Sequence, residues 1–275
     1  MLEQLQYKNH MGETYSFGKD GIFVNINDLR DYEWSVIKQG ERIGGFERKI
    51  TKKKIPIVIL QKTEEAARAA QNRLHEVTEK DVIAHKYGNI IIGDYYMRGY
   101  ITKSQKADYL RTGRYVAYTL TLTTDFPVWI KETKHVFRKS SESGAGGKNL
   151  DYVFDYPFDY KSTTGNSQFN NTSISASNFR LLIYGACVDP EIKIGGHVYK
   201  VNGKVEANEY LTIDSVTREI YLTKNDGTRV NRFDDRYRRS YIFEPIPTGI
   251  AYVSWEGDFG LDLILFDERS EPKWI

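Results

Sequence analysis

The sequence predicts a mainly β protein with two parts, an α+β N-terminal domain with one main helix and a C-terminal antiparallel β-sandwich. Many short segments alternate apolar and polar residues with a period of two, glycine-containing turns separate them, and one long helical pattern lies in the first half. A glycine- and serine-rich run, SSESGAGG at residues 140–147, divides the halves. We therefore expect domains at residues 1–135 and 151–275, joined by a linker at 136–150. A chain of 275 residues is long enough for two separate cores.

The first half opens with short strand candidates. Residues 22–26 alternate in the manner of a half-buried strand, and residues 32–38 form a second candidate that Gly40 closes. The apolar run IPIVILQ at residues 55–61 is typical of a strand that is buried on both faces.

The main helix is expected directly after this run. Thr63 is a suitable N-cap, and Glu64 and Glu65 in the first turn complement the helix dipole. Small and apolar residues then recur at helical spacing, which predicts a face that packs closely on a sheet. These residues are Ala66, Ala70, Leu74 and Val77. The pattern predicts an end near Glu76, with Thr78 capping a further short turn.

Strands resume after the helix. Residues 89–102 are interrupted by Gly93 and Gly99, whereas residues 114–124 alternate without a break. The expected faces of this strand are Tyr115, Ala117, Thr119 and Thr121 on one side and Val116, Tyr118, Leu120 and Leu122 on the other.

The second half predicts a series of hairpins and no helix. Turns are expected at residues 195–196, 214–217, 225–227 and 257–260, between short alternating segments. Short strands at near-regular spacing favour an antiparallel sandwich.

Residues 151–160, DYVFDYPFDY, predict an edge strand with one aromatic face. Every even-numbered position is aromatic, and Pro157 lacks the N–H group that a central strand needs. We consider these aromatic residues candidates for an interface: Tyr152, Phe154, Tyr156, Phe158 and Tyr160.

Composition argues against several functional classes. The net charge of +2 is too small for a general nucleic-acid binder. Cys187 is the single cysteine of the sequence, so no intramolecular disulfide can form, and synthesis in a reducing cytoplasm is expected. The N-terminus lacks the pattern of a signal peptide, and no apolar stretch approaches the ~20 residues of a membrane span. We therefore expect a soluble protein without a recognisable export signal.

The sequence predicts no catalytic, metal or cofactor site. The five histidines are scattered without metal-ligand spacing. Asp258-Phe259-Gly260 is similar to a kinase magnesium motif, but the sequence lacks the companion motifs, so a hairpin loop is expected. Three acidic pairs are typical of turns and strand faces, and a glycoside hydrolase that uses one of them is the least favoured hypothesis. These pairs are Asp155 and Asp159, Asp234 and Asp235, and Glu256 and Asp258.

Residues 229–243, RVNRFDDRYRRSYIF, interleave arginines with aromatic residues. Such a pattern suits a protein interface, nucleic-acid stacking or sugar binding, and a solvated loop is the alternative. Asp234 and Asp235 neutralise part of the charge, which favours a protein interface over nucleic acid. The candidate interface residues are Arg232, Arg236, Tyr237 and Arg239.

Several segments together resemble the distal tail protein (Dit) family of long-tailed, siphovirus-type bacteriophages. They are FDYPFDY at 154–160, NEYLTIDSVTREIYL at 208–222 and GIAYVSWEGDFGLDLILFDERSEPKW at 249–274. The first half is similar in layout, with short strands, one helix after an apolar strand, and then GDYYMRGYIT and YVAYTLTLTTDFPVW. The resemblance covers nearly the whole chain, and its motifs are specific in combination.

This resemblance implies a structural protein of the virion tail tip, or baseplate. Family members form a hexameric ring through their N-terminal domains, which joins the tail tube to the tail-associated lysin or fibre and leaves a channel for DNA. Their C-terminal domain is a galectin-like β-sandwich on which receptor-binding proteins dock. We therefore expect a homo-hexamer with these partners, without a membrane, a specific nucleic acid, a cofactor or an enzymatic activity. The alternative is a lectin-like carbohydrate-binding module that takes part in host-cell recognition.

Overall fold

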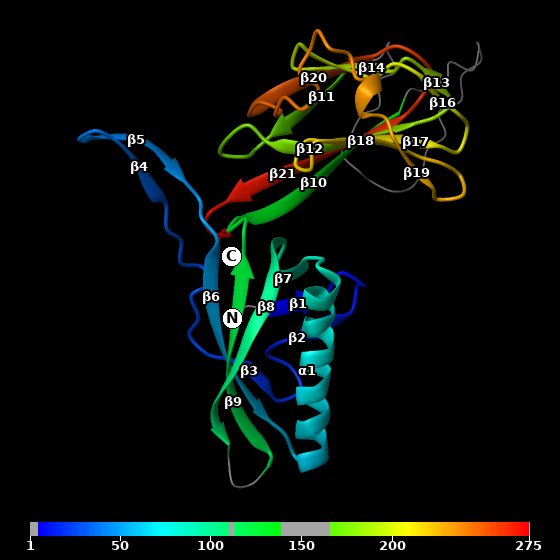
Figure 1. Ribbon diagram of the computed structural model, residues 1–275. Coiled ribbons are helices and arrows are strands. Elements are labelled where there is room, and N and C mark those ends of the chain that lie inside the picture. Colours follow the sequence, from blue (N-terminus) through cyan, green and yellow to red (C-terminus); the bar gives the residue numbers. More distant parts are fainter. Residues whose placement is uncertain (1–4, 110–112, 139–165, 275) are drawn as a thin grey trace, which may run out of the picture. The chain divides into compact units, whose positions relative to one another are not determined.

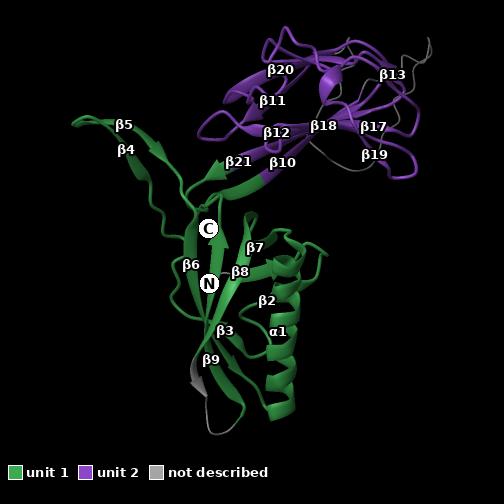
Figure 2. Ribbon diagram, in the orientation of Figure 1, with its two compact units in different colours: residues 1–131, 268–275 green, residues 132–267 purple. Residues whose placement is uncertain are grey.

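The computed structural model describes residues 5–109, 113–138 and 166–274. The chain forms two compact units, unit 1 with residues 1–131 and 268–275 and unit 2 with residues 132–267 (Figure 2). Strands dominate both units, which confirms the predicted mainly β class (Figure 1). The aromatic strand expected at residues 151–160, with Tyr152, Phe154, Tyr156, Phe158 and Tyr160, lies outside the described residues.

Most strands of unit 1 pair antiparallel, and one long strand, β8, joins them into a single connected arrangement. The strands are β1 (Leu5–Lys8), β2 (Thr14–Ser16), β3 (Ile22–Val24), β6 (Thr51–Leu60), β7 (Gly88–Ile92), β8 (Tyr95–Tyr109), β9 (Tyr115–Thr124) and the start of β10 (Trp129–Phe137). One path runs β10-β8-β7-β1-β2, and a second runs β3-β6-β9-β8. Residues 95–99 of β8 pair with β7, and residues 100–109 pair with β9, so β8 joins the two paths.

The alternation predicted for residues 114–124 is confirmed in β9. Val116, Tyr118, Leu120 and Leu122 are buried in the core of unit 1, and the other face is half-buried. The expectation that residues 55–61 are buried on both faces is wrong. Only one face of β6 is fully buried, through Ile55, Ile57 and Ile59, while Leu60 is exposed, because this sheet is covered on one side only.

The predicted interruption at Gly93 is confirmed, but the one at Gly99 is wrong. Gly93 has φ of 57° and forms the turn between β7 and β8. Gly99 lies inside β8 and pairs with Gly88. A Cβ at Gly99 would lie 2.8 Å from the Thr123 carbonyl oxygen, so glycine there permits close strand packing without a break in the strand.

Helix α1 (Glu64–Ala84) begins where the sequence predicts. Thr63 is the N-cap and accepts a hydrogen bond from the backbone N–H of Ala66 at 3.2 Å. The predicted end near Glu76 is wrong, because the helix continues for two more turns. Thr78 is buried, and its hydroxyl donates to the Leu74 carbonyl at 2.8 Å, so it is accommodated inside the helix. The helix ends at His85, whose φ is 52°.

The last turn of α1 carries a fully buried carboxylate, Asp81. One of its oxygens accepts the Tyr7 hydroxyl at 2.5 Å, and the other accepts the backbone N–H of His10 at 2.8 Å and the His10 Nδ1 at 2.5 Å. Burial, and then the hydrogen bond to Asp81, raise the pKa of Tyr7. A Cβ at Gly88 would clash with both Asp81 and Tyr7. The network therefore ties α1, β1 and β7 together.

Unit 2 is a two-layer antiparallel sandwich. One layer has the order β19-β18-β17-β12-β21-β10, and the other has the order β11-β20-β14-β15. The strands are β11 (Asn166–Asn171), β12 (Asn178–Tyr184), β14 (Glu191–Ile194), β15 (His197–Lys200), β17 (Tyr210–Asp214), β18 (Glu219–Thr223), β19 (Arg229–Asn231), β20 (Gly249–Trp255) and β21 (Leu261–Arg269). A short pair, β13 (Cys187–Val188) and β16 (Lys204–Val205), lies outside the layers. Apolar side chains from both layers form one core between them.

Two of the predicted hairpins are confirmed, and the third is wrong. Strands β14 and β15 pair across Gly195 and Gly196, and β17, β18 and β19 pair in sequence. Strand β20, however, pairs with β11 and β14, whereas β21 pairs with β12. The connection between them therefore crosses from one layer to the other, and Trp255 and Phe259 both enter the core. The Trp255 indole N–H donates to the Phe259 carbonyl at 2.9 Å and fixes this crossing.

Replacing Asp81 by alanine is expected to lower the free energy of unfolding of unit 1 by about 3 kcal/mol, since the buried Tyr7 hydroxyl and the partly buried His10 donors lose their acceptor. The matched change Asp94→Ala removes a carboxylate that is 70% exposed and paired with Lys131, and it should cost less than about 1 kcal/mol. Urea denaturation measures both. Equal losses in the two variants would contradict the structural role of Asp81.

The stability of unit 2 is expected to fall at acid pH because of His135. Its ring lies 4.8 Å from the Phe169 ring, and burial lowers its pKa below the ordinary 6.5. The unfolded chain therefore binds the proton more readily, so stability present above pH ~6.5 is lost as the pH falls, by at most about 1.4 kcal/mol per pH unit from this group. Thermal unfolding between pH 7 and 5 should show a shallower dependence in His135→Gln. An unchanged dependence would refute the assignment.

Candidate interaction surfaces

Strands β4 (Ser35–Gln39) and β5 (Arg42–Glu47) form a two-stranded sheet of their own in unit 1. Figure 1 shows them as an arm that projects from the start of β6. Gly40, with φ of 63°, lies in the turn between them, and the register shifts between Ile37 and Lys38. The sequence predicted the first strand and missed the second, for which the glycine turn was the available signal. An isolated two-stranded sheet is only marginally stable in water, so contact with another molecule would stabilise this arm.

The arm has an apolar face that is open to solvent. Val36 lies opposite Phe46, and Lys38 lies opposite Ile43, so these side chains share a face. The exposed fractions are 47% for Val36, 59% for Phe46 and 64% for Ile43. Trp34 extends this face, since its ring packs edge-on against Phe46 at 6.5 Å.

The opposite face of the arm is mainly polar. Ser35 lies opposite Glu47, and Gln39 lies opposite Arg42, while Ile37 is its exposed apolar member. The amphipathic pattern distinguishes the arm from an ordinary solvated loop, and it makes the apolar face a candidate interaction surface.

The arginine-rich segment of unit 2 forms a loop with a short 3-10 helix, η1 (Phe233–Asp235). Two of the predicted interface residues form hydrogen bonds within unit 2 that hold this loop. Arg232 donates to Asp235 at 3.0 Å, and the backbone N–H of Tyr237 donates to the Lys200 carbonyl at 3.0 Å. Neither residue lines the pocket that the segment forms.

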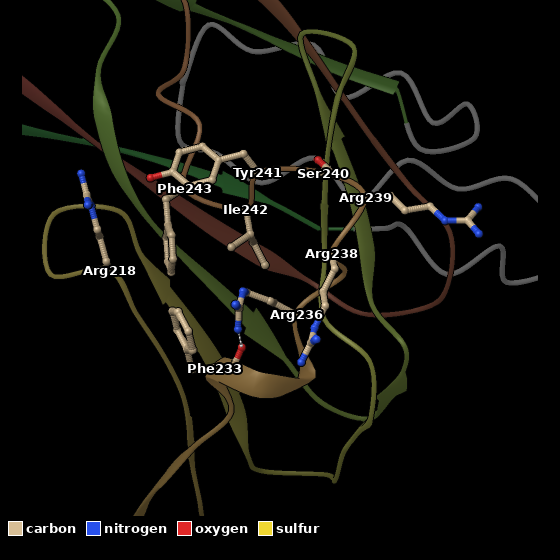
Figure 3. Close-up of a pocket in the computed structure, with 9 residues that line it drawn as sticks. All are labelled: Arg218, Phe233, Arg236, Arg238, Arg239, Ser240, Tyr241, Ile242 and Phe243. Carbon is tan, nitrogen blue, oxygen red and sulfur yellow. Dashed lines mark hydrogen bonds between the residues drawn. The ribbon is translucent and has the colours of Figure 1, made fainter.

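The other two predicted residues, Arg236 and Arg239, line an open pocket of about 510 Å³ together with Arg238 and Arg218 (Figure 3). Arg218 comes from the turn between β17 and β18, where its φ is 57°. Sequence reasoning did not find Arg218, because only the fold brings this turn beside the loop. In the view of Figure 3, Arg218 lies on one side of the Phe233 and Phe243 rings and the other three arginines lie on the opposite side, with the Arg239 side chain extending away from the rings.

Aromatic rings form the wall of this pocket. Phe233 and Phe243 stack with centroids 6.2 Å apart and an interplanar angle of 19°. The guanidinium of Arg236 lies 3.9 Å above the Phe233 ring and donates to the Phe233 carbonyl at 2.7 Å. Tyr241 is 51% exposed and packs edge-on against Phe243. Cationic groups therefore lie beside aromatic surface, a combination that is enriched in protein interfaces.

Elsewhere in the described residues there is neither a metal-binding cluster nor a reactive thiol. They contain no group of three or more His, Cys, Asp or Glu residues that could hold a metal ion. Cys187 is half-buried against the sandwich core, and burial raises its pKa to about 11, which keeps the thiol protonated. Within the described part of the chain, no helix combines the length and the apolar character that a membrane crossing needs.

No protein-family model matches the chain, and no curated protein matches it. Solved structures do match. The SPP1 Dit (gp 19.1) protein, described as a paradigm of the hub adsorption apparatus in phages that infect Gram-positive bacteria, aligns with a TM-score of 0.61 at 11% identity, over 98% of this chain and 100% of that chain. Chains of the phage P2 baseplate in its activated conformation align with TM-scores of 0.63 in the Ca form and 0.60 in the Sr form, each at 11% identity, over 99% of this chain and 100% of theirs.

At 11% identity these matches concern the fold. They support the expected similarity to phage distal tail proteins, since the alignments span both units. The chain thus has, over nearly its whole length, the fold of a phage Dit protein and of phage baseplate chains.

Proposed function

We propose that the chain is a structural hub protein of a phage tail tip, without enzymatic activity. In this role it forms a hexameric ring that connects the tail tube to the tail-associated lysin or fibre and leaves a channel through which DNA passes. The observation that carries the proposal is the fold match over 98% of the chain to a protein described as a hub of the adsorption apparatus. The matched baseplate chains support the same location in the virion.

In this proposal each of the two expected domains has its own role. The N-terminal domain, at residues 1–135, forms the ring and faces the tail tube, and the C-terminal domain, at residues 151–275, docks a receptor-binding protein. The segment at 136–150 links the two. Host cytoplasm is the place of synthesis, and neither a membrane nor a specific nucleic acid is a partner. All of these contacts are non-covalent, so the role requires no catalytic group.

The β4–β5 arm supports ring formation through unit 1. A closed ring of identical subunits needs two different surfaces on each copy, one that inserts and one that receives. The apolar face of the arm is suited to insertion. Exposed apolar residues also lie at the end of α1, where Ile83 is 75% exposed and Met11, next to the His10–Asp81 contact, is 65% exposed. In Figure 1 the arm and α1 lie on opposite sides of unit 1, as a head-to-tail contact requires.

Replacing Phe46 by glutamate is expected to break the hexamer into smaller species, because each ring contact would then bury a charge in an apolar interface. Gln39→Glu introduces the same charge on the polar face of the same arm and should leave the hexamer intact. Light scattering coupled to size exclusion measures the mass of both variants and of the unaltered protein.

Circular dichroism should show that both variants remain folded, since both side chains are exposed. An unaltered protein that stays monomeric at high concentration would count decisively against the ring. Labelling of the chain on assembled particles, followed by electron microscopy, tests the location, and a label anywhere except the tail tip would exclude it.

A further inference from the structure

We propose that the arginine-lined pocket of unit 2 binds an acidic segment of a partner protein through its carboxylates. The pocket is lined by Arg218, Arg236, Arg238 and Arg239. The proposal rests on the docking role of the C-terminal domain proposed above, and it gives that role a site and a chemistry.

Among the described residues, little negative charge compensates the arginines of the pocket. Within the described part of the chain, no carboxylate lies within ion-pair distance of Arg218, Arg238 or Arg239. Arg236 has only Asp234, at 3.8 Å, whose side chain is 93% exposed. Arg232, outside the pocket, is by contrast paired with Asp235 at 3.0 Å. Like charges gathered on one surface repel one another, and an anionic partner relieves that repulsion.

The lining also selects for ligands that only accept hydrogen bonds. Guanidinium groups are pure donors, and the described lining contains no carboxylate or carboxamide side chain. Ser240 already donates its hydroxyl to the Val198 carbonyl at 2.6 Å. Sugar hydroxyls both donate and accept, whereas a carboxylate only accepts. The donor-rich wall therefore fits an anion better than a neutral saccharide.

A protein carboxylate fits better than a phosphate polymer. Phosphate sites commonly add backbone N–H groups to their cationic side chains. Here the backbone N–H of Arg236, which lines the pocket, already donates to the Phe233 carbonyl. The positive charge is instead carried by long side chains in an open pocket that the 51% exposed Tyr241 also lines. Arginine and tyrosine side by side are typical of the energetic centres of protein interfaces.

The loop that presents these groups is held in place before any partner arrives. His197 Nε2 donates to the Tyr241 carbonyl at 2.8 Å, and the Tyr199 hydroxyl donates to the Glu244 carbonyl at 2.7 Å. Ile242 and Phe243 between them are buried in the core of unit 2. A pre-ordered loop loses little conformational entropy on binding.

The test uses the full chain and a fluorescent ten-residue peptide of glutamates with one central phenylalanine, followed by anisotropy. We expect binding that weakens with added salt, and at least about a tenfold loss of affinity in Arg218→Glu/Arg238→Glu, since two charge-assisted contacts are replaced by repulsion. Lys224→Glu/Arg229→Glu gives the same change in net charge at the opposite end of β18 and should change affinity by less than about twofold.

Several outcomes would overturn the proposal. They are equal binding of the glutamine version of the peptide, an equal loss in the two double variants, and preferential binding of a glycerol-phosphate oligomer, which would assign the pocket to a phosphate polymer. Circular dichroism confirms that the variants are folded. The mass of the same samples separates the two proposals. A hexamer that does not bind the peptide refutes only the pocket proposal, and a monomer that binds the peptide refutes only the ring proposal.

Discussion

The hydrogen bonds to one buried carboxylate hold unit 1 in its observed form. Asp81 is the point at which the last turn of α1 meets β1 and β7, and it accepts from two side chains and one backbone N–H. A buried carboxylate is tolerated only when donors surround it, so Tyr7, His10 and Asp81 must be positioned together. The same arrangement requires glycine at position 88, because a Cβ there would clash with both Asp81 and Tyr7. The position of α1, and with it the exposure of Ile83 and Met11, follows from this arrangement.

The two units present surfaces of different physical character. In unit 1 the open surface is the apolar face of the β4–β5 arm, and in unit 2 it is a cationic pocket beside aromatic rings. Apolar contacts suit an assembly that forms once and persists, since their stability scales with buried area and hardly depends on salt. Charged contacts suit recognition and fast association with a partner. A hub that assembles with itself and then receives another protein would use both kinds of surface in this way.

Much of the fold could be predicted from local patterns. The alternation in β9, the N-cap at Thr63 and the two-glycine turn at 195–196 are signals within a few residues, and the structure contains all three. The length of α1 was missed because Thr78 and Asp81 are polar residues on its buried face, where only tertiary partners make them acceptable. The sequence predicts a β20–β21 hairpin from alternating strands and a turn, but it does not show which layer each strand joins. Arg218 was missed for the same reason, since its neighbours in the pocket are distant in the chain.

A fold shared at 11% identity requires that different side chains satisfy the same geometric demands. In the sandwich of unit 2 those demands are apolar side chains at alternate positions of both layers, which many combinations of Val, Ile, Leu and Phe fulfil. Interaction surfaces are under no such general demand, because each must fit its own partner. The exposed rings of the arm and the arginines of the pocket are therefore the features that carry information specific to this chain. Among the described residues, their exposed apolar area and unpaired charge are costs that contact with another molecule would remove.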